Sequence, residues 1–493
     1  MHTTRVVAVD DPAATPVPHR PQRTQPPEPQ MPLNDAARRA ESRRIALSSF
    51  VGSAIEFYDF LLYGAAASLV FNELFFTDLN ALAGTIAAFG TLAVGYVARP
   101  LGGIVFGHFG DRVGRKSMLV LTMTLMALAS FAIGLLPTYG TVGIWAPILL
   151  VVCRLVQGVA VGGEWGGAAL MAMEHASAGH RGLMASFANM GGPAGAVLAT
   201  AVFAAFSALP EDDFLAWGWR VPFLLSLLLM AIGLFIRLKV TESPVFTEAQ
   251  RRAALETPKQ EAPLLTVLRR YRKNIVLSCL GGCAALVLQS LLATFMLTYA
   301  TGVGFERSTV LLAQTVSSAL HIFTIPAFAM LSDRVGRRPV MITGALVTAA
   351  AAFPLFALVN SGSATLLFVA YIIGNPILQA SMYGPMAAFV SEMFGTRARY
   401  TGASLGYQLS STLGAGTAPL VASSLLAGAG GDTNSASVSV YLIAVCLVSA
   451  TAIALTRESH RADITDAGTI ASAAGGAPGR QGADAVMRGS SVE

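Results

Sequence analysis

The chain has 493 residues, of which 54% are hydrophobic and only 12% are charged, and its mean hydropathy is +0.60. A soluble domain carries about 25% charged residues, so this composition excludes an ordinary cytosolic enzyme. So much apolar surface also excludes disorder over the bulk of the chain. The small net charge of +5 favours a membrane over nucleic acid as the partner. We therefore expect an integral membrane protein that binds no nucleic acid.

The first and last segments differ in composition from the rest of the chain. Residues 1–33 contain eight of the 24 prolines and no long apolar run, and they lack the apolar core of a signal peptide. The residues after Arg457 are rich in Ala, Gly and Asp. Neither segment can build a packed core, so we expect residues 1–40 and 457–493 to be disordered cytoplasmic tails.

Twelve apolar stretches lie between these tails, each close to the roughly 20 residues that cross about 30 Å of hydrocarbon. In chain order we place them at residues 45–72, 80–106, 117–136, 143–172, 182–208, 218–238, 274–299, 309–331, 340–359, 363–390, 401–427 and 437–456. The sequence therefore predicts an all-α membrane protein with twelve transmembrane helices.

Lysine and arginine are concentrated in alternate loops. Basic clusters occupy the following positions: Arg38, Arg39, Arg43, Arg44, Arg112, Arg115, Lys116, Arg181, the segment from Arg237 to Lys273, Arg334, Arg337, Arg338, Arg397, Arg399 and Arg457. The other loops contain only Arg220 and Arg307, beside five acidic residues. By the positive-inside rule we expect the basic loops and both termini to be cytoplasmic.

A charged motif near the end of the second stretch recurs after the eighth. Gly110-Asp111-Arg112-Val113-Gly114-Arg115-Lys116 and Ser332-Asp333-Arg334-Val335-Gly336-Arg337-Arg338 lie at an offset of 222 positions (111 to 333). Glu174 and Glu392 each precede an arginine by seven residues, at an offset of 218 (174 to 392). We infer two six-helix halves, 41–238 and 274–456, joined by a cytoplasmic linker at 239–273. Parallel repeats are typical of secondary transporters whose site lies between the halves.

These motifs resemble those of the major facilitator superfamily. The pattern Gly107-x-x-x-Asp111-Arg112-x-Gly114-Arg115-Lys116 is similar to the loop motif of that superfamily, although Ala329 replaces the leading glycine in the second copy. Further motifs resemble its metabolite:proton symporter branch, and within it most of all the shikimate transporters: Glu56-Phe57-Tyr58-Asp59-Phe60, Arg99-Pro100-Leu101-Gly102-Gly103, Arg154-x-x-Gln157-Gly158, Gly162-Gly163-Glu164-Trp165-Gly166-Gly167, Trp217-Gly218-Trp219-Arg220-Val221-Pro222-Phe223 and Glu242-Ser243-Pro244-Val245-Phe246. Relatives in this branch carry 2-oxoglutarate, citrate, proline or betaine, so the resemblance leaves the substrate open.

Two carboxylates fall inside the first predicted span. An ionisable side chain inside a bilayer needs a partner, water or a function. Glu56 and Asp59 are one helical turn apart, roughly 16–21 Å from the cytoplasmic start of the helix and so near the midplane. Two close carboxylates seldom ionise together, which favours proton coupling by this pair. The alternative is that one of them only pairs with an arginine and holds helices together.

Arg154 in the fourth span is the expected counter-charge, at a depth similar to that of Asp59. Arginine stays protonated, so it can hold a carboxylate ionised in one state and bind a substrate carboxylate in another. Competition between a proton and Arg154 for Asp59 would then couple the proton to conformation. The alternative is a permanent salt bridge. Gln157, one turn further on, is expected on the same face.

The Asp-Arg-x-Gly-Arg loops miss the spacing of a phosphate-binding loop. In the superfamily this loop acts as a cytoplasmic latch, which implies a gating role for Asp111, Arg112, Arg115, Asp333, Arg334 and Arg337; the alternative is topogenic charge alone. We add Arg99 and Glu164 to this group. Glu164 lies about 15 Å further along the fourth span than Arg154, toward the cytoplasm. The two residues are too far apart to pair, so we expect Arg99 or Arg112 to be the partner of Glu164.

Polar residues at helical spacing predict a substrate-binding face. The C-terminal half has almost no mid-membrane charge but carries neutral hydrogen-bonding side chains, which suit a hydroxylated solute and also bind helices to each other. The expected substrate-binding residues are Tyr63, Arg154, Gln157, Trp165, Asn189, Gln289, His321, Asn375, Gln379, Tyr383, Tyr407 and Gln408.

These features predict a secondary transporter that imports a small organic anion or polyol acid such as shikimate by proton symport. The runner-up is a proton-coupled antiporter that exports drugs or metabolites, but Gly192-Pro193-Ala194-Gly195-Ala196 matches its span-5 signature only in part. An enzyme is disfavoured because His175 and His180 lack further ligands, and a channel because charge rings are absent. We expect a monomer in the inner or plasma membrane, driven by the proton gradient without a cofactor.

Overall fold

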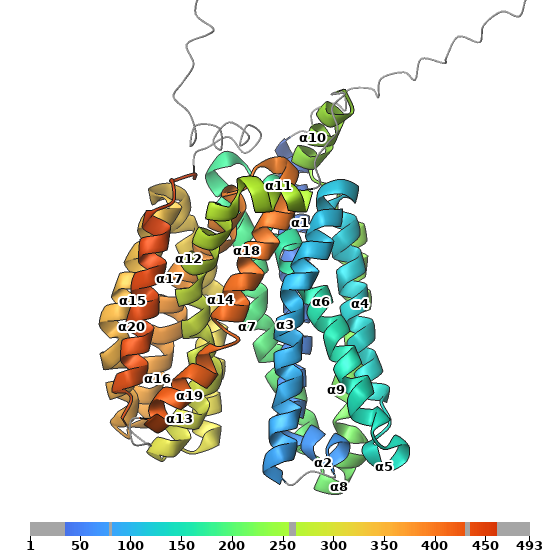
Figure 1. Cartoon of the computed structure of the whole chain (residues 1–493), viewed down its shortest axis with the longest axis vertical. Coiled ribbons are helices and arrows are strands. Elements are labelled where there is room, and N and C mark those ends of the chain that lie inside the picture. The colour runs from blue at the N-terminus through green and yellow to red at the C-terminus, as the bar shows by residue number, and fades with distance from the viewer. Residues whose placement is uncertain (1–34, 78–80, 256–262, 429–433, 461–493) are drawn as a thin grey trace, which may run out of the picture. The chain divides into compact units, whose positions relative to one another are not determined.

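The computed structural model describes residues 35–77, 81–255, 263–428 and 434–460, and these residues form helices and short connections (Figure 1). By its contacts the chain divides into residues 1–39 and 40–493. Of the first unit only residues 35–39 are described, as the start of α1 (Asp35–Leu69). The predicted tails therefore lie outside the described residues, except that α1 begins before the expected boundary at residue 41 and that residues 457–460 are described.

Twelve helical segments of the described chain are long and apolar enough to span a membrane, as predicted. They are Ala40–Ala67, Gly90–Val113, Arg115–Leu135, Trp145–Glu174, Arg181–Ser207, Glu211–Leu238, Arg272–Val303, Arg307–Val335, Arg337–Asn360, Ala364–Glu392, Arg399–Gly428 and Ala436–Ala454. Most ends agree with the sequence prediction within a few residues. The main differences are the second span, which begins ten residues later and ends seven residues later than predicted, and the sixth, which starts seven residues earlier.

Eight spans lie within single helices, and four are interrupted. The continuous helices are α1, α3 (Ala81–Val113), α4 (Arg115–Leu135), α6 (Trp145–Glu174), α7 (Arg181–Ser207), α14 (Arg307–Val335), α15 (Arg337–Asn360) and α20 (Ala436–Ala454). The interrupted spans combine α8 (Glu211–Asp213), η2 (Phe214–Gly218) and α9 (Arg220–Leu238); α12 (Arg272–Ser290), η3 (Leu291–Phe295) and α13 (Met296–Val303); α16 (Ala364–Ile372), η4 (Ile373–Gln379) and α17 (Ala380–Glu392); and α18 (Arg399–Leu413) with α19 (Ala418–Gly428). Pro376 lies within η4, where its missing N–H accounts for the wider π-helical turn.

The sequence repeat is also a structural repeat. Gly114 separates α3 from α4, and Gly336 separates α14 from α15 at the same offset of 222 positions (114 to 336). Both have positive φ, +126° and +107°, a conformation that strains any residue with a Cβ atom. Each half therefore reverses direction at an equivalent glycine inside the charged motif.

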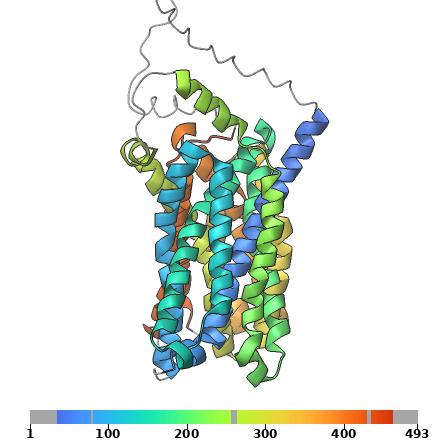
Figure 2. The ribbon, with the colours of Figure 1, turned by 90° about the vertical axis from the view of Figure 1, so that its right-hand side faces the viewer.

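The two halves meet mainly along two pairs of helices, with further contacts of α17 (Ala380–Glu392) to α7 and of α17 and α18 to α6. The upper part of α3 lies beside α18 in Figure 1, and α7 and α14 pack together in the same way. The linker forms α10 (Pro244–Leu255) and α11 (Pro263–Arg270), which lie at the same end as the α3–α4 turn (Figure 2). We call this end, with the α3–α4 and α14–α15 turns and the linker helices, the basic end. The acidic helix α8 lies at the opposite end (Figure 1).

Candidate functional site

Two carboxylates lie one helical turn apart inside the N-terminal half. Glu56 and Asp59 are both on α1 and are only 3% and 1% exposed. Asp59 accepts a hydrogen bond from the hydroxyl of Ser226 on α9. Glu56 Oε2 and Asp59 Oδ2 have no hydrogen-bond partner among the described residues. Each carboxylate thus keeps one oxygen that a proton, water or ligand can occupy.

Arg154 on α6 borders the same cavity but is not ion-paired with Asp59. Its Nη1 donates to Gln157 Oε1 at 3.1 Å, and Gln157 Nε2 donates to Ser130 Oγ at 2.6 Å. Ser130 in turn contacts the Asp59 carboxylate. Neither the predicted direct pairing nor a permanent salt bridge is present in this conformation, because a relay through Gln157 and Ser130 connects the two groups instead.

Aromatic rings hold the Arg154 guanidinium in place. Its Cζ lies 4.2 Å from the ring centroid of Tyr63 and 4.7 Å from that of Phe60, and a desolvated cation over a ring is stabilised by about 2 kcal/mol. The Tyr63 hydroxyl donates to Thr91 Oγ1 at 2.6 Å. Gly95 of α3 leaves room for the guanidinium, because a Cβ atom there would lie 2.6 Å from Arg154 Nε.

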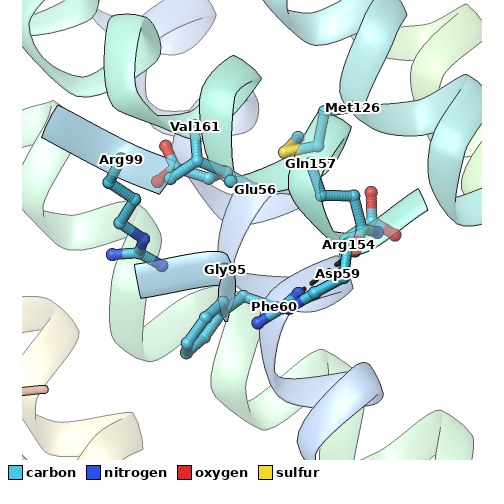
Figure 3. Close-up of a pocket in the computed structure, with 10 residues that line it drawn as sticks. Glu56, Asp59, Phe60, Gly95, Arg99, Met126, Arg154, Gln157 and Val161 are labelled. Atoms are coloured by element: carbon cyan, nitrogen blue, oxygen red, sulfur yellow. Dashed lines mark hydrogen bonds between the residues drawn. The ribbon is translucent and has the colours of Figure 1, made fainter. Parts of the chain in front are cut away.

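These groups surround a small cavity between α1, α3, α4 and α6 (Figure 3). Its walls are formed by Glu56, Asp59, Phe60, Gly95, Arg99, Met126, Arg154, Gln157, Gly158 and Val161. The free volume is about 10 Å³, close to the smallest that holds one water molecule. In this conformation the cavity can therefore hold water or a proton but not an organic acid.

Arg99, which we expected in the latch, borders this cavity instead. It is 5% exposed and lies on α3, three turns before the charged motif at the basic end. Its Nη1 donates to Ser411 Oγ of α18 at 3.5 Å, so it also contacts the C-terminal half. The structure thus places two arginines and two carboxylates around one cavity.

Glu164 is ion-paired with Arg237 of α9, and both side chains are buried. The predicted partners were therefore wrong: Arg99 lies at the central cavity, and Arg112 is exposed. Arg237 was counted with the basic residues between the sixth and seventh spans. It lies in the last turn of α9 with its side chain buried, and its Nη1 also donates to the carbonyl of Leu119 at 2.6 Å.

Five of the predicted substrate-binding residues connect the two halves in this conformation. They are Trp165, Asn189, Tyr383, Tyr407 and Gln408, all buried. Trp165 stacks on Tyr407 with ring centroids 3.6 Å apart, and its Nε1 donates to Asn189 Oδ1 at 2.8 Å. Asn189 Nδ2 donates to the Tyr383 carbonyl at 2.6 Å, and Gln408 donates to two carbonyls of α6. These groups bind each other rather than line the cavity.

Four further predicted substrate-binding residues lie in the C-terminal half, away from the cavity: Gln289, His321, Asn375 and Gln379. Asn375 and Gln379 belong to η4, and Asn375 Nδ2 donates to Ser317 Oγ of α14 at 3.2 Å. His321 Nε2 and Gln379 Oε1 are buried without a hydrogen-bond partner among the described residues. Gln289 is half-buried. None of these side chains lines the cavity around Arg154.

At the basic end, each charged motif is bonded to the opposite half. Asp111 accepts hydrogen bonds from the backbone N–H groups of Tyr400 and Thr401 at the start of α18, at 3.1 and 3.0 Å. Asp333 does the same at the start of α7, at 2.8 and 2.9 Å. The first N–H groups of a helix lack intrahelical partners and carry the positive end of its dipole. The two aspartates therefore make equivalent contacts between the halves.

Arg115 and Arg337 bind buried glutamates. Glu174 pairs with Arg115 and, at 3.0 Å, with Arg399 of the other half. Arg337 pairs with Glu392 at 3.2 Å within its own half. We predicted no role for these glutamates, although their repeated spacing before an arginine is the sequence signal that points to them.

The first arginine of each motif faces solvent. Arg112 and Arg334 are exposed and form no hydrogen bond or ion pair with any described residue. Within each motif the aspartate and the second arginine form the buried contacts, and the last basic residue, Lys116 or Arg338, donates to backbone carbonyls of its own half. Across the described residues, no group of three or more His, Cys, Asp and Glu side chains is placed to hold a metal ion.

Known proteins resemble the chain over most of its length. The family model described as sugar (and other) transporter matches residues 45–456. The shikimate transporter of Escherichia coli (strain K12) is 40% identical over 430 residues, which are 86% of this chain and 96% of that protein. An inner membrane metabolite transport protein of the same strain is 38% identical over 426 residues, 85% and 94% of the two chains. The solved proton:xylose symporter XylE of the major facilitator superfamily, bound to 6-bromo-6-deoxy-D-glucose, matches with a TM-score of 0.70 at 18% identity, over 88% of this chain and 99% of that one.

The chain therefore belongs to the sugar (and other) transporter family of the major facilitator superfamily. It is a membrane transporter with twelve spans and a small-molecule substrate, and not an enzyme. The fold and the class of protein that the sequence predicted are confirmed.

Proposed function

We propose that this transporter imports a small organic anion, such as shikimate or a related carboxylate, together with protons. One observation carries the proposal: two buried carboxylates and a buried guanidinium with unbonded N–H groups share a single cavity inside the membrane-spanning bundle. Ionisable groups at such a depth are expensive and usually serve an ion or substrate pathway. The similarity to a shikimate transporter supports a carboxylate as the substrate.

In the proposed mechanism Glu56 and Asp59 take up the proton, and Arg154 binds the anion. Arginine keeps its charge throughout the cycle, so it can exchange one anionic partner for another. The relay through Gln157 and Ser130 links the guanidinium to Asp59, so that a change at one end is transmitted to the other. Rocking of the two halves would then open the loaded cavity to either side in turn.

We further propose that the basic end is cytoplasmic, since its loops carry the excess of lysine and arginine. Both termini would then be cytoplasmic, and the contacts at Asp111 and Asp333 would close the site on that side. Labelling with a membrane-impermeant maleimide tests this orientation. In intact cells we expect Asp212→Cys to react and Arg112→Cys to react only after permeabilisation; the reverse pattern would invert the proposed topology. Both positions are exposed.

Uptake into proteoliposomes tests the function itself. The purified chain is reconstituted, a pH gradient of about one unit is imposed, and uptake of shikimate, quinate, protocatechuate, 2-oxoglutarate, citrate and betaine is compared. We expect an acidic exterior to drive accumulation of at least one carboxylate. Accumulation driven by an acidic interior would establish antiport instead, and transport of betaine alone would exclude an anion as the substrate. We expect a monomer without a cofactor to suffice.

A further inference from the structure

Two buried guanidiniums, not one, face the acid pair. Arg99 and Arg154 are 5% and 2% exposed and border the same cavity (Figure 3). Both stack on one ring: their Cζ atoms lie 4.5 and 4.7 Å from the centroid of Phe60. A second ring supports each of them, Tyr96 at 4.6 Å from Arg99 and Tyr63 at 4.2 Å from Arg154.

Neither arginine has an anionic partner in this conformation. Among the described residues, no carboxylate is within salt-bridge distance of Arg99 or Arg154, and Nε and Nη2 of Arg154 have no hydrogen-bond partner. Buried polar groups are hydrogen-bonded in the large majority of cases, and the exceptions call for a ligand or water. Aromatic faces stabilise the cations only in part, so the pair of guanidiniums lacks an acceptor that a bound anion would supply.

The net charge around the cavity is zero only in some combinations of bound proton and bound anion. Nearby opposite charges favour ionisation, so beside Arg99 and Arg154 both Glu56 and Asp59 can ionise although they lie close together. Their two negative charges then balance the two arginines, and one bound proton leaves a net charge of +1. The other titratable groups facing the site do not alter this sum: Glu164 and Arg237 neutralise each other, and Tyr63, Tyr96, Tyr383 and Tyr407 are phenols. An uncompensated charge at such a site costs several kcal/mol.

We propose that Arg99 and Arg154 together bind the carboxylate of a singly charged substrate, and that one proton enters the acid pair with each anion. This inference rests on the proposed function and deepens it. The empty site and the fully loaded site are then both neutral, whereas a proton alone leaves +1 and an anion alone leaves −1. Only the two neutral forms can reorient at low energy, so proton and anion must cross together, and the transport cycle carries no net charge.

The membrane potential provides the decisive test on the unaltered protein. Shikimate uptake into proteoliposomes is measured at a fixed pH gradient, with the potential clamped by potassium and valinomycin at zero or at about 100 mV, inside negative. For one proton per monoanion we expect about tenfold accumulation per unit of pH gradient, with the same value at both potentials. Accumulation that rises with an inside-negative potential would overturn the inference while leaving proton symport intact. An absence of gradient-driven uptake for every acid tried would overturn the proposed function instead.

Variants of Arg99 separate anion binding from a contact between the halves. Because a charge-assisted hydrogen bond contributes about 1.5–3 kcal/mol, we expect Arg99→Gln to raise the KM for shikimate about tenfold to a hundredfold. Arg99→Lys, which keeps the charge, should recover part of this loss. The comparison is Ser411→Ala, which removes the 3.5 Å hydrogen bond from Arg99 to the other half but keeps the guanidinium. If both Arg99→Gln and Ser411→Ala change transport to the same extent, Arg99 is only an inter-half contact and the inference is wrong.

Discussion

Asp59 and Glu56 share a helix face but differ in their surroundings. Asp59 accepts a hydrogen bond from Ser226 and is connected through Ser130 and Gln157 to Arg154, whereas Glu56 Oε2 is buried without a partner among the described residues. Asp59 is therefore the carboxylate that is connected to Arg154.

Replacing Asp59 by Asn should uncouple transport from the proton gradient. The amide keeps the size of the side chain but cannot take up and release a proton, so we expect accumulation to fall from about tenfold per unit of pH gradient to simple equilibration. Counterflow exchange of labelled shikimate should persist, because the arginines remain. Ser226→Ala is the matched control, since it removes only the hydrogen bond. Continued accumulation by Asp59→Asn would show that Asp59 does not carry the proton.

A single glycine sets the space available to Arg154. A Cβ atom at position 95 would lie 2.6 Å from Arg154 Nε and 3.1 Å from its Cζ, so Gly95→Ala must displace the guanidinium. Crowding of this kind costs about 1–3 kcal/mol, and we expect the KM for shikimate to rise about tenfold. Gly90→Ala, on the same helix with nothing within 4 Å of its Cβ position, should transport normally. Equal kinetics for the two variants would contradict this geometry.

At the scale of the helices, a buried ion pair and one hydrogen bond to it connect α4, α6 and α9. Glu164 of α6 pairs with Arg237 of α9 and accepts a hydrogen bond from Thr122 of α4 at 3.1 Å. Removing one member of a buried pair leaves an uncompensated charge and costs about 3–5 kcal/mol.

We therefore expect Arg237→Met to lower the stability of the detergent-purified protein by about 3–5 kcal/mol, measured as the free energy of unfolding in denaturant. The double variant with Glu164→Gln should recover most of that loss, because no charge remains unpaired. Additive losses in the double variant would mean that the two residues act independently.

Glu458 lies outside the membrane spans and caps the N-terminus of α15. Its carboxylate accepts hydrogen bonds from the backbone N–H groups of Arg337 and Arg338, both at 3.0 Å. Partial burial raises the pKa of Glu458, but these bonds, the N–H of His460 and the His460 charge outweigh that effect. Together they hold the pKa below the usual glutamate value of 4.5.

A depressed pKa gives a defined pH dependence. The contact of Glu458 with α15 should be fully present above the pKa that Glu458 has in the unfolded chain. It should be lost as the pH falls through the lower pKa that Glu458 has in the folded protein. Hydrogen exchange of the Arg337 and Arg338 amides should thus be faster in Glu458→Gln than in the unaltered protein near neutral pH, and equal in both at acidic pH below the folded pKa. A difference that persists there would refute the assignment.

At the scale of the whole transporter, the contacts between the halves follow the internal repeat. Asp111 and Asp333 bond to the starts of α18 and α7, and Glu174 adds an ion pair to Arg399 across the boundary. Further toward the middle, Trp165 stacks on Tyr407. The basic end is thus closed in this conformation, and opening it requires both helix-end contacts to break.

Asp111→Ala should favour opening at the basic end. Loss of a carboxylate at a helix start costs about 0.5–2 kcal/mol, which corresponds to roughly a twofold to thirtyfold shift in the equilibrium. We expect a cysteine at the buried position Ser404, in a background without the four native cysteines, to be alkylated faster by about this factor. Arg112→Gln, at an exposed position of the same motif, is the control. An unchanged rate in Asp111→Ala would show that this contact does not hold the halves together.

The sequence alone determined the fold class, the twelve spans, the internal repeat and the acidic pair in the first span. These features depend on local properties: an apolar run of a given length must cross the bilayer as a helix, and the spacing of Glu56 and Asp59 places them on one helix face. A repeated motif such as Asp111 and Asp333 needs no structure to be found.

Only the tertiary structure decided which charged groups meet. Helical spacing shows which residues share a face, but it does not give the rotation and depth of one helix against another. For this reason Glu164 was assigned to the wrong arginine, Arg99 was placed in the latch rather than at the cavity, and the relay between Arg154 and Asp59 was missed. Partners from distant parts of the chain are chosen by how the helices pack, and that packing depends on every side chain between them.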